Sequence, residues 1–440
     1  MIVHKFGGAS VKDAESIRRI PSLLKSMDNE RAFIVISAMG KTTNKLEVIT
    51  NAAFEGNSYL VLFDSLKDEH LAVYDELQIE GENSRKELIE LFANCLNVIE
   101  TTAKDNYSFF YDQVVSYGER FSSLILEKYL NHSGFDVKLL DAGKLFSADD
   151  NWRAGNINHS LTEWNISNAI TGNDNDFLIT QGFIAGNGSG DYLTLGREGS
   201  DYSAALVAVY SNASEIIFWK DVDGIYSSDP NVEWRMENGE LRMENGELGV
   251  VKIEKMSYSE MIELSFFGAK VLHEKALFAL QDKNIKMQVR SFLDIHKSGT
   301  CFYNNYDEKY PSIKIISENQ ILYTCEPHER AIINSNHIKY IYDCANECNV
   351  NISLIQMSAL KISFCVDFDE FACDRMLHNL EKKFKVKYNN DIILVTLRHY
   401  SPNDIAEFEN AKNIILSQVS RVVAQYVIVE THGRASVREK

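Results

Sequence analysis

Glycines gather in the stretch from Gly182 to Tyr210, GFIAGNGSGDYLTLGREGSDYSAALVAVY, and together with the helix that follows them they suit the binding of an anion. An apolar run at 177–180 precedes it and predicts a buried strand, and an apolar helix opens at Ser200-Asp201. Glycine lets backbone amides approach a ligand without a Cβ in the way, and the first amides of a helix are unpaired and partly positive. We expect Ser200 or Asp201 to cap this helix. A glycine-rich hairpin before a capped helix, without any ligand, fits the same letters.

Three other polar or glycine-rich segments directly follow apolar runs that predict strands. They are 5–10 (KFGGAS), 37–44 (SAMGKTTN) and 219–231 (WKDVDGIYSSDPN). Ligands of parallel α/β sheets bind at the carboxyl ends of the strands. We therefore expect these three segments and 182–201 to converge on one edge of a sheet.

Strands that alternate with helices up to about residue 303 predict an α/β sandwich with a mainly parallel sheet. Beyond Pro311-Ser312 the pattern changes to strand, helix, two strands, helix, strand, which is the βαββαβ order of a ferredoxin-like module, with a partial second copy. In that second copy we expect a helix over 405–416 and a strand over 425–429. The predicted domains are 1–305 and 311–440.

Three local features complete the expected structure. Pro21 should kink or break the helix that follows residue 14. The segment 116–120, which contains Gly118, should interrupt the helical pattern of 109–130. The heptad RMENGEL occurs twice in succession, at 235–241 and 242–248, and its Asn-Gly pairs indicate a lengthened surface loop without function.

The composition of the 440-residue chain excludes several classes of function. A net charge of −18 argues against nonspecific binding of nucleic acid or of an acidic membrane, because both need a basic surface. No apolar run approaches the roughly 18 residues of a membrane span, and no signal peptide is evident, so we expect a cytoplasmic protein. The seven cysteines lack zinc-binding spacing and are expected to be buried free thiols.

Six motifs in the first 303 residues, in this order, resemble those of aspartate kinases. They are Lys5-Phe6-Gly7-Gly8, Ser37-Ala38, Ser116-Tyr117-Gly118-Glu119, Leu195-Gly196-Arg197-Glu198-Gly199-Ser200-Asp201, Asp221-Val222-Asp223-Gly224-Ile225-Tyr226 and Phe267-Gly268-Ala269-Lys270-Val271-Leu272-His273. The resemblance implies an amino-acid-kinase-type α/β/α sandwich followed by ACT modules. It also implies transfer of the ATP γ-phosphoryl group to the β-carboxylate of L-aspartate, the first step towards lysine, threonine and methionine.

This reaction fits the residue inventory of the chain. A carboxylate nucleophile is already ionised at pH 7, so no general base is needed. The site must instead bring two anions together with cations, amides and Mg²⁺. The Walker sequence GxxxxGK[ST] does not occur, so other glycine loops and lysines must hold the phosphates.

The resemblance implies two groups of site residues. On the nucleotide side, Lys5 neutralises the phosphates, and the other members are Gly7, Gly8, Ser10, Lys220, Asp221, Tyr226 and Lys270. On the aspartate side, Arg197 pairs with the α-carboxylate, Glu119 and Asp201 take the α-ammonium, and the lining residues are Ser37, Thr43, Trp152 and Ser200. The resemblance also makes Asp201 an organiser of Lys5. Each assignment has a structural alternative: a solvated lysine, a surface ion pair, a helix cap or plain packing.

Three positions depart from the aspartate kinase pattern. Lys220 stands where the family usually has Thr, Asn231 where it has Arg, and Glu274 where it has Pro. A nucleotide contact is therefore missing, and Lys220 or Arg235 is left to supply its charge. These changes leave nucleotide affinity open and affect the aspartate side less.

The C-terminal modules resemble ACT domains in pattern, and the segment 349–355 lies where effectors commonly bind. We expect a homodimer through these modules, with lysine or threonine as effector; a dimerisation module without an effector is the alternative. Two other functions stay open, another amino-acid kinase such as a glutamate or acetylglutamate kinase, and a catalytically impaired amino-acid sensor.

Overall fold

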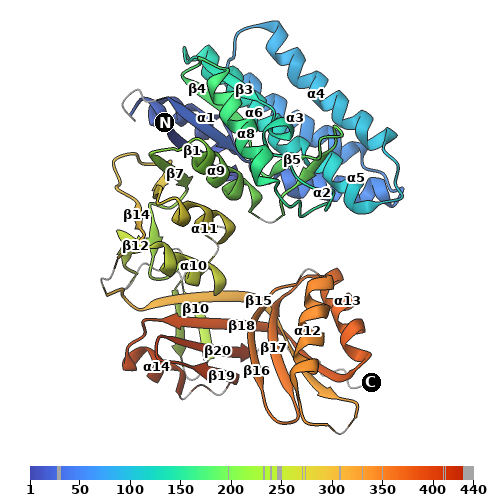
Figure 1. Cartoon of the computed structure of the whole chain (residues 1–440), viewed down its shortest axis with the longest axis vertical. Coiled ribbons are helices and arrows are strands. Elements are labelled where there is room, and N and C mark those ends of the chain that lie inside the picture. Colours follow the sequence, from blue (N-terminus) through green and yellow to red (C-terminus); the bar gives the residue numbers. More distant parts are fainter. Residues whose placement is uncertain are drawn as a thin grey trace. The chain divides into compact units, whose positions relative to one another are not determined.

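The structure, a computed structural model, describes residues 1–429 apart from 27–30, 197, 231–232, 238–239, 245–249, 270, 273, 307–308, 330, 349, 410 and 412. The chain forms two compact units (Figure 1). Unit 1 comprises 1–225, 254–262 and 271–306, and unit 2 comprises 226–253, 263–270 and 307–440. Two short segments of the predicted first domain, 226–253 and 263–270, therefore cluster with the C-terminal part. The division into domains 1–305 and 311–440 stays a prediction.

Unit 1 is built on one eight-stranded sheet of order β12-β14-β13-β7-β1-β2-β4-β3, and all its neighbours are parallel except β13 and β14. The mainly parallel sheet is thus confirmed. Its strands are β1 (Ile2–Phe6), β2 (Ala32–Ile36), β3 (Val137–Leu140), β4 (Phe177–Gln181), β7 (Glu215–Lys220), β12 (Lys255–Ser257), β13 (Lys286–Ser291) and β14 (Thr300–Tyr303).

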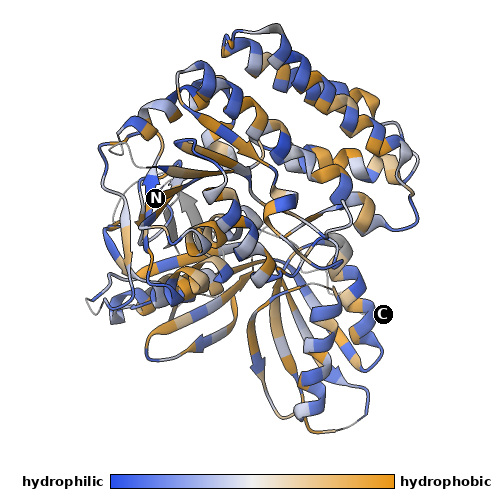
Figure 2. Ribbon diagram, turned by 45° about the horizontal axis from the view of Figure 1, so that its top comes forward, coloured by the Kyte–Doolittle hydropathy of each residue, from blue (hydrophilic) through white to orange (hydrophobic). Residues whose placement is uncertain are grey.

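Helices cover both faces of this sheet, and the strand sequences explain why. Ile34 and Ile36 in the fully buried β2 belong to the core that holds α1–α6, whereas Phe33 and Val35 alternate to the other face. On that other face α9 packs against β1, β2 and β7 and against α11. Figure 2 shows the hydrophobic colouring of the strands. The helices are α1 (Ala14–Lys25), α2 (Thr42–Phe54), α3 (Leu60–Glu76), α4 (Glu82–Thr101), α5 (Tyr107–Val115), α6 (Tyr117–His132), α7 (Ala142–Leu145), α8 (His159–Thr171), α9 (Gly199–Tyr210), α10 (Tyr258–Phe266) and α11 (Glu274–Asp282).

Of the two predicted interruptions of helices in unit 1, a break at Pro21 is wrong and the one within 116–120 is confirmed. Helix α1 continues through Pro21 to Lys25. The break near 116–120 falls at Ser116 alone, and Gly118 lies inside α6. A Cβ at Gly118 would lie 3.2 Å from Cβ of Ala38, so this glycine allows close packing of α6 on the loop after β2 rather than ending a helix.

Unit 2 contains a six-stranded antiparallel sheet of order β16-β17-β15-β18-β20-β19. Its elements are β15 (Ile313–Pro327), α12 (Ser335–Cys348), β16 (Ile352–Met357), β17 (Ile362–Asp367), α13 (Glu370–Glu381), β18 (Phe384–Arg398), α14 (Pro402–Glu409), β19 (Ile414–Val419) and β20 (Val423–Val429). The first six give the predicted βαββαβ order, so the ferredoxin-like fold of this part is confirmed.

The strands β15 and β18 run through both halves of this sheet. Register shifts interrupt their pairing between Ser317 and Leu322, where the sheet bends back on itself. An apolar cluster fills the space between the two halves, and Nε2 of Gln356 in β16 donates to the Ser417 carbonyl in β19 at 3.3 Å. The predicted helix over 405–416 is wrong, because α14 ends at Glu409 and residues 414–419 form β19.

The RMENGEL repeat contributes two paired strands instead of an irregular loop. Strands β9 (Glu233–Glu237) and β10 (Glu240–Glu244) are antiparallel, and Arg235 faces Arg242 across the pair. The Asn-Gly pair at 238–239 lies outside the described residues. Short strands β5 (Ile184–Gly186) and β6 (Tyr192–Thr194) pair with each other, and β8 (Ile225–Tyr226) pairs with β11 (Lys252–Ile253).

All seven cysteines are free thiols, of which Cys301 is partly exposed and the others are buried. Among the described residues, no helix has the length and apolar character that crossing a bilayer requires.

Candidate active site

The predicted convergence of four strand exits is confirmed. The strands β7, β1, β2 and β4 are consecutive parallel neighbours, so their carboxyl ends share one edge of the sheet. Lys5 is opposite Val35 on one side and Phe218 on the other. The residues that follow each strand therefore meet above β1.

A buried charge cluster forms at this edge. Nζ of Lys5 lies 2.5 Å from Oδ1 of Asp201, and both side chains are almost fully buried. Nζ of Lys220 lies 3.6 Å from Oδ2 of the same carboxylate, and its side chain is 23% exposed. Two ammonium groups thus share one carboxylate, which leaves a net positive charge beside the glycine loops.

Burial and mutual attraction set the titration of this cluster. Burial lowers the pKa of Lys5; Asp201 opposes that shift and the charge of Lys220 adds to it. Burial alone would raise the pKa of Asp201, but Lys220 and Lys5 together hold it below its ordinary value. Asp201 is therefore an anion at neutral pH, and it fixes the position of Lys5.

The loop after β1 lies tightly against the loop after β2. A Cβ at Gly8 would lie 2.8 Å from the Gly40 carbonyl oxygen and 2.9 Å from that of Ala38, so only glycine fits there. The Gly40 amide donates to the Gly8 carbonyl at 3.0 Å. A Cβ at Gly7 would point at Nζ of Lys5, 3.6 Å away.

Ser10 differs from the expectation that it offers donors to a phosphate. Its hydroxyl donates to the Trp219 carbonyl at 3.3 Å, and its amide donates to the Gly7 carbonyl at 2.9 Å. The hydroxyl thus joins the 3₁₀ turn Gly8–Val11 to β7, and the amide bond closes the start of that turn. In this structure Ser10 supports the loop.

Glu119 is a buried carboxylate beside the loop after β2. Its Oε1 accepts from the Ala38 amide at 3.2 Å, whereas its Oε2 is buried without a hydrogen-bond partner. Burial raises the pKa of Glu119 to about 8. Nearby, the Ser37 carbonyl accepts from the Ser122 hydroxyl at 2.7 Å, and Thr43 lies partly exposed in the first turn of α2. The unpaired, buried Oε2 of Glu119 is a ready acceptor for a cationic ligand group.

The predicted cap of α9 is wrong. The helix begins at Gly199, its N-cap is Glu198 in the left-handed region (φ 54°) without a side-chain cap, and Ser200 and Asp201 stand in the first turn. A Cβ at Gly182 would lie 2.9 Å from Cα of Ser200, so this glycine lets the helix start close to the end of β4. Arg197 is outside the described residues, and its predicted role stays untested.

Trp152 lies in the loop between α7 and α8, where its ring packs edge-on against Phe109 of α5, with 4.9 Å between centroids. On the nucleotide side, Asp221 is exposed just after β7, and Tyr226 belongs to unit 2. Lys270 and Asn231 are outside the described residues, as is the side chain of Arg235. The structure therefore brings together Lys5, Asp201 and Lys220, and it positions Glu119 next to the same loops.

Sequence reasoning missed two features of this region. Phe183 follows Gly182 with a positive φ of 68°, and its amide donates to the Ser203 hydroxyl of α9 at 3.1 Å. Asp112, four residues before Ser116, is fully buried and contacts the loop that carries Trp152. No local pattern indicates either role, because both depend on contacts between distant segments.

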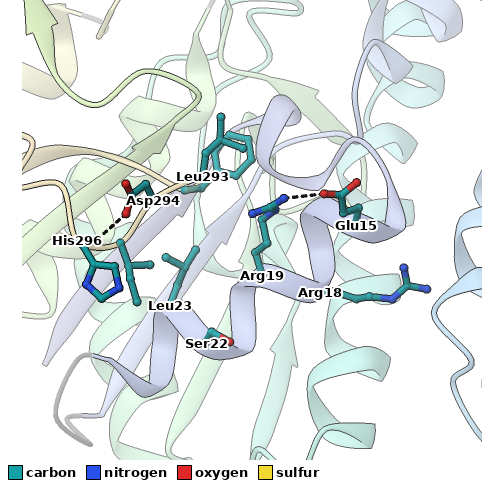
Figure 3. A pocket seen from close by; sticks show the side chains of 10 residues that line it. Glu15, Arg18, Arg19, Ser22, Leu23, Leu293, Asp294 and His296 are labelled. Atoms are coloured by element: carbon teal, nitrogen blue, oxygen red, sulfur yellow. Dashed lines mark hydrogen bonds and ion pairs between the residues drawn. The ribbon is translucent and has the colours of Figure 1, made fainter.

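Two hollows in unit 1 are separate from the predicted site residues. One, of about 450 Å³, lies between α1 and the segment 292–296 (Figure 3). Its arginines are engaged, since Arg19 pairs with Glu15 at 2.6 Å and Arg18 with Glu76 at 3.2 Å. The other, of about 490 Å³, is lined from α4, α6 and the end of β3.

The described part of the chain contains no group of three or more His, Cys, Asp or Glu side chains arranged to hold a metal ion. The acidic residue of the charge cluster, Asp201, is neutralised by two lysines.

Comparison with known proteins gives the family context. Residues 1–291 match the model of the amino acid kinase family. The lysine-sensitive aspartokinase 3 of Escherichia coli is 28% identical over 408 residues, which are 90% of this chain and 86% of that protein. A bifunctional aspartokinase/homoserine dehydrogenase of Arabidopsis thaliana is 25% identical over 407 residues, which are 87% of this chain and 42% of that protein.

Solved structures agree on the fold. E. coli aspartokinase III in complex with aspartate and ADP has a TM-score of 0.80 at 24% identity, with 98% of this chain and 96% of that chain covered. The same enzyme in complex with lysine and aspartate has a TM-score of 0.76 over the same shares. Aspartate kinase of Clostridium acetobutylicum has a TM-score of 0.69 at 20% identity.

Proposed function

The chain belongs to the amino acid kinase family, and we propose that it phosphorylates the β-carboxylate of L-aspartate with ATP, giving 4-phospho-L-aspartate and ADP. The observation that carries the proposal is the shared carboxylate of Asp201, which fixes Lys5 and Lys220 at the edge where four strand exits meet. Relatives along most of the chain's length are aspartokinases.

The chemistry of this transfer needs charge compensation more than proton transfer. A β-carboxylate oxygen attacks the γ-phosphorus, the bond to the bridging oxygen breaks, and ADP leaves with the electron pair. The acceptor is already ionised, so the protein must reduce the repulsion between two anions. Lys5 and Lys220 would do this together with Mg²⁺, which enters as MgATP. Asp201 would hold Lys5 rigid, so that little reorganisation accompanies the transfer.

The aspartate end of the site would recognise the two α-substituents of the substrate. The unpaired Oε2 of Glu119 suits the α-ammonium, and Arg197 would pair with the α-carboxylate. The walls would be formed by Ser37, Thr43, Trp152 and Ser200. Because burial raises the pKa of Glu119 to about 8, binding of the ammonium near neutral pH should release a proton from this carboxyl.

At the nucleotide end, the tight loop of Gly7 and Gly8 would present its backbone to the phosphate chain, with Ser10 supporting that loop. Further contacts would come from Asp221, Tyr226 and Lys270. Lys220 would replace the cation that Asn231 does not provide. Its contact with Asp201 favours this role over that of a solvated surface lysine.

Unit 2 would act as the regulatory part, with ACT modules, a homodimer and lysine or threonine as effector. The ferredoxin-like order of its elements supports this proposal, and a complex of the E. coli relative contains lysine. Titration of the activity with each amino acid tests it. A cytoplasmic location and a place at the start of lysine and threonine synthesis also stay predictions.

One assay tests the proposed function against its alternatives. The purified protein is incubated with MgATP, hydroxylamine and either aspartate, glutamate or acetylglutamate, and the hydroxamate is measured. We expect product with aspartate only, and none with Lys5→Ala. Product with glutamate or acetylglutamate instead would assign another amino-acid kinase, and no product from the folded wild type with any of them would assign a sensor.

A further inference from the structure

Asp112 is a buried carboxylate that the proposed chemistry does not use. It lies in α5 with no exposed surface, and both its oxygens accept hydrogen bonds from segments distant in sequence. Oδ2 accepts from the Arg153 amide at 2.7 Å, and Oδ1 accepts from the Thr194 hydroxyl at 2.7 Å. One side chain thus joins α5 to the loop at 147–159 and to β6.

The neighbouring contacts make these three segments a single unit. Gln113 holds the backbone of Tyr192, since its amide group donates to that carbonyl at 2.6 Å and accepts from that amide at 3.3 Å. The Gly155 amide donates to the Thr194 carbonyl at 3.0 Å. Strand β6 is therefore held between side chains of α5 on one side and the loop backbone on the other.

Both segments that Asp112 holds lead directly into the proposed aspartate end. Arg153 follows Trp152, and it adopts a positive φ of 68°, a conformation that a residue with a Cβ takes only when neighbouring contacts enforce it. Thr194 lies three residues before Arg197 and five before the start of α9. Loss of the two hydrogen bonds would therefore free both the loop that carries Trp152 and the strand β6 that leads to Arg197.

We propose that Asp112 is a positioning residue that sets the affinity for the amino-acid substrate, by locking the Trp152 loop and the strand that leads to Arg197. The inference rests on the proposed function, because it assigns these segments to the aspartate end. The nucleotide side, built on β1 and β7, does not contact Asp112 through any described hydrogen bond. Loss of Asp112 should therefore lower the affinity for aspartate and leave the affinity for ATP unchanged.

The environment of Asp112 adds a dependence on pH. Burial raises its pKa to about 6, with only partial relief from its hydrogen-bond donors and from Arg153. The Arg153 guanidinium stacks over the Tyr111 ring at 4.4 Å and over the Tyr107 ring at 5.6 Å, and it lies 4.0 Å from Glu47. A protonated Asp112 could donate its O–H to the Thr194 oxygen while Oδ2 still accepts from the Arg153 amide, so below pH 6 both links persist but are weaker, because the acceptor has lost its charge.

The experiment compares Asp112→Ala, Asp112→Asn and Thr194→Val with the wild type and with Tyr258→Phe, which removes a buried hydrogen bond to Ile285 elsewhere in unit 1. Steady-state constants for aspartate and for ATP are measured from pH 5.5 to 8.5, together with Tm. Asparagine keeps both links without a charge, since its oxygen can accept from the Arg153 amide and its NH₂ can donate to the Thr194 oxygen.

We expect Asp112→Ala to raise the KM for aspartate by about tenfold or more and to leave that for ATP within about twofold, because small misplacements of binding groups cost that much. Thr194→Val should shift the same constant in the same direction by less. Asp112→Asn should stay near the wild type at pH 7.5 and lack the additional rise of this KM below pH 6.

Equal changes of both constants, or losses that follow Tm as they do in Tyr258→Phe, would overturn the assignment. Should Asp112→Ala not fold, an unchanged aspartate KM in Thr194→Val would overturn it as well. Failure of the proposed function is a separate result, because there the wild type itself gives no product with aspartate.

Discussion

Nζ of Lys220 lies 3.6 Å from Oδ2 of Asp201, the carboxylate whose Oδ1 lies 2.5 Å from Nζ of Lys5. The residue that departs from the family pattern at the end of β7 is therefore joined to the charge cluster at the end of β1. This contact supports the proposal that Lys220 supplies the cation that Asn231 does not provide. It also makes the role of Lys220 measurable apart from that of Lys5.

Replacement of Lys220 should weaken the nucleotide side selectively. We expect Lys220→Thr to raise the KM for ATP and to lower kcat, because the transferring phosphoryl group loses one of two nearby ammonium groups, whereas the KM for aspartate changes little. Initial rates with each substrate varied in turn give these constants. Lys297→Ala, which removes a lysine paired with Asp223 near the same edge, is the matched control. Equal effects in both variants would contradict the assignment.

Removal of Lys5 should abolish turnover. Lys5→Ala takes away the buried ammonium, leaves Asp201 with Lys220 alone, and should lower kcat by about 10²–10³-fold or more, the loss typical of a group that stabilises transition-state charge. Circular dichroism and Tm establish that the variant is folded. Turnover within a few-fold of the wild type would refute the mechanism.

Ionisation of the buried Glu119 should lower the free energy of unfolding as the pH rises towards 8. Its folded pKa of about 8 lies above the ordinary 4.5, so the native state binds more protons between these values and stability falls as pH rises from about 4.5 to 8. Glu119→Gln should therefore match the wild type in Tm near pH 4.5 and exceed it at pH 8.5, while the KM for aspartate rises. Thermal unfolding at both pH values checks the sign, and a variant less stable at pH 8.5 would contradict it.

The same pKa predicts coupling between aspartate and protons. Calorimetric titration at pH 7 in two buffers of different ionisation enthalpy should show that a fraction of a proton is released as aspartate binds. In Glu119→Gln the observed heats should no longer depend on the buffer. Heats that are independent of the buffer in the wild type would remove Glu119 from the ammonium site.

The contact between the first two loops should tolerate no side chain at Gly8. A Cβ there meets two backbone oxygens at 2.8 and 2.9 Å, whereas a Cβ at Gly118 meets side-chain atoms at 3.2–3.4 Å, which can shift. We expect Gly8→Ala to raise the KM for ATP and to reduce Tm more than Gly118→Ala does. The reverse order in either measurement would contradict this account of the loop.

Asn231→Arg, which restores the residue usual in the family, should leave the KM for ATP unchanged or lower it. A markedly higher value would mean that the arginine interferes with the cation that Lys220 provides. Because residue 231 lies outside the described part, kinetics are the direct way to decide.

Much of the fold was predictable because its signals are local and consistent. The apolar run at 177–180 was predicted as a buried strand and lies in β4, since short apolar runs that end at polar segments are typical of buried strands. The convergence of Lys5 and Asp201 followed from the general rule about carboxyl ends of parallel strands. Where the local signal fits two structures, prediction failed: Ile405, Phe408 and Ile415 fit a helical spacing, although α14 ends at Glu409 and Ile415 lies in β19.

The missed parts of the site are those that depend on distant segments. The prediction of the α9 cap was wrong because Glu198 adopts the left-handed conformation. A glutamate rarely does so, and no sequence pattern indicates it here. The bond from Asp112 to Thr194 joins residues 82 apart, and nothing near either residue indicates the other. The pairing of Lys220 with Asp201 likewise becomes visible only once β7 and β1 are known to be neighbours.

The continuous strands β15 and β18 have a consequence for how the C-terminal unit can change. Each supplies backbone pairing to both halves of the sheet, so neither half can be excised, swapped with a homologue or permuted without cutting a strand that the other requires. The two modules should accordingly melt in one cooperative transition, and an engineered variant would have to keep or replace them as a single piece.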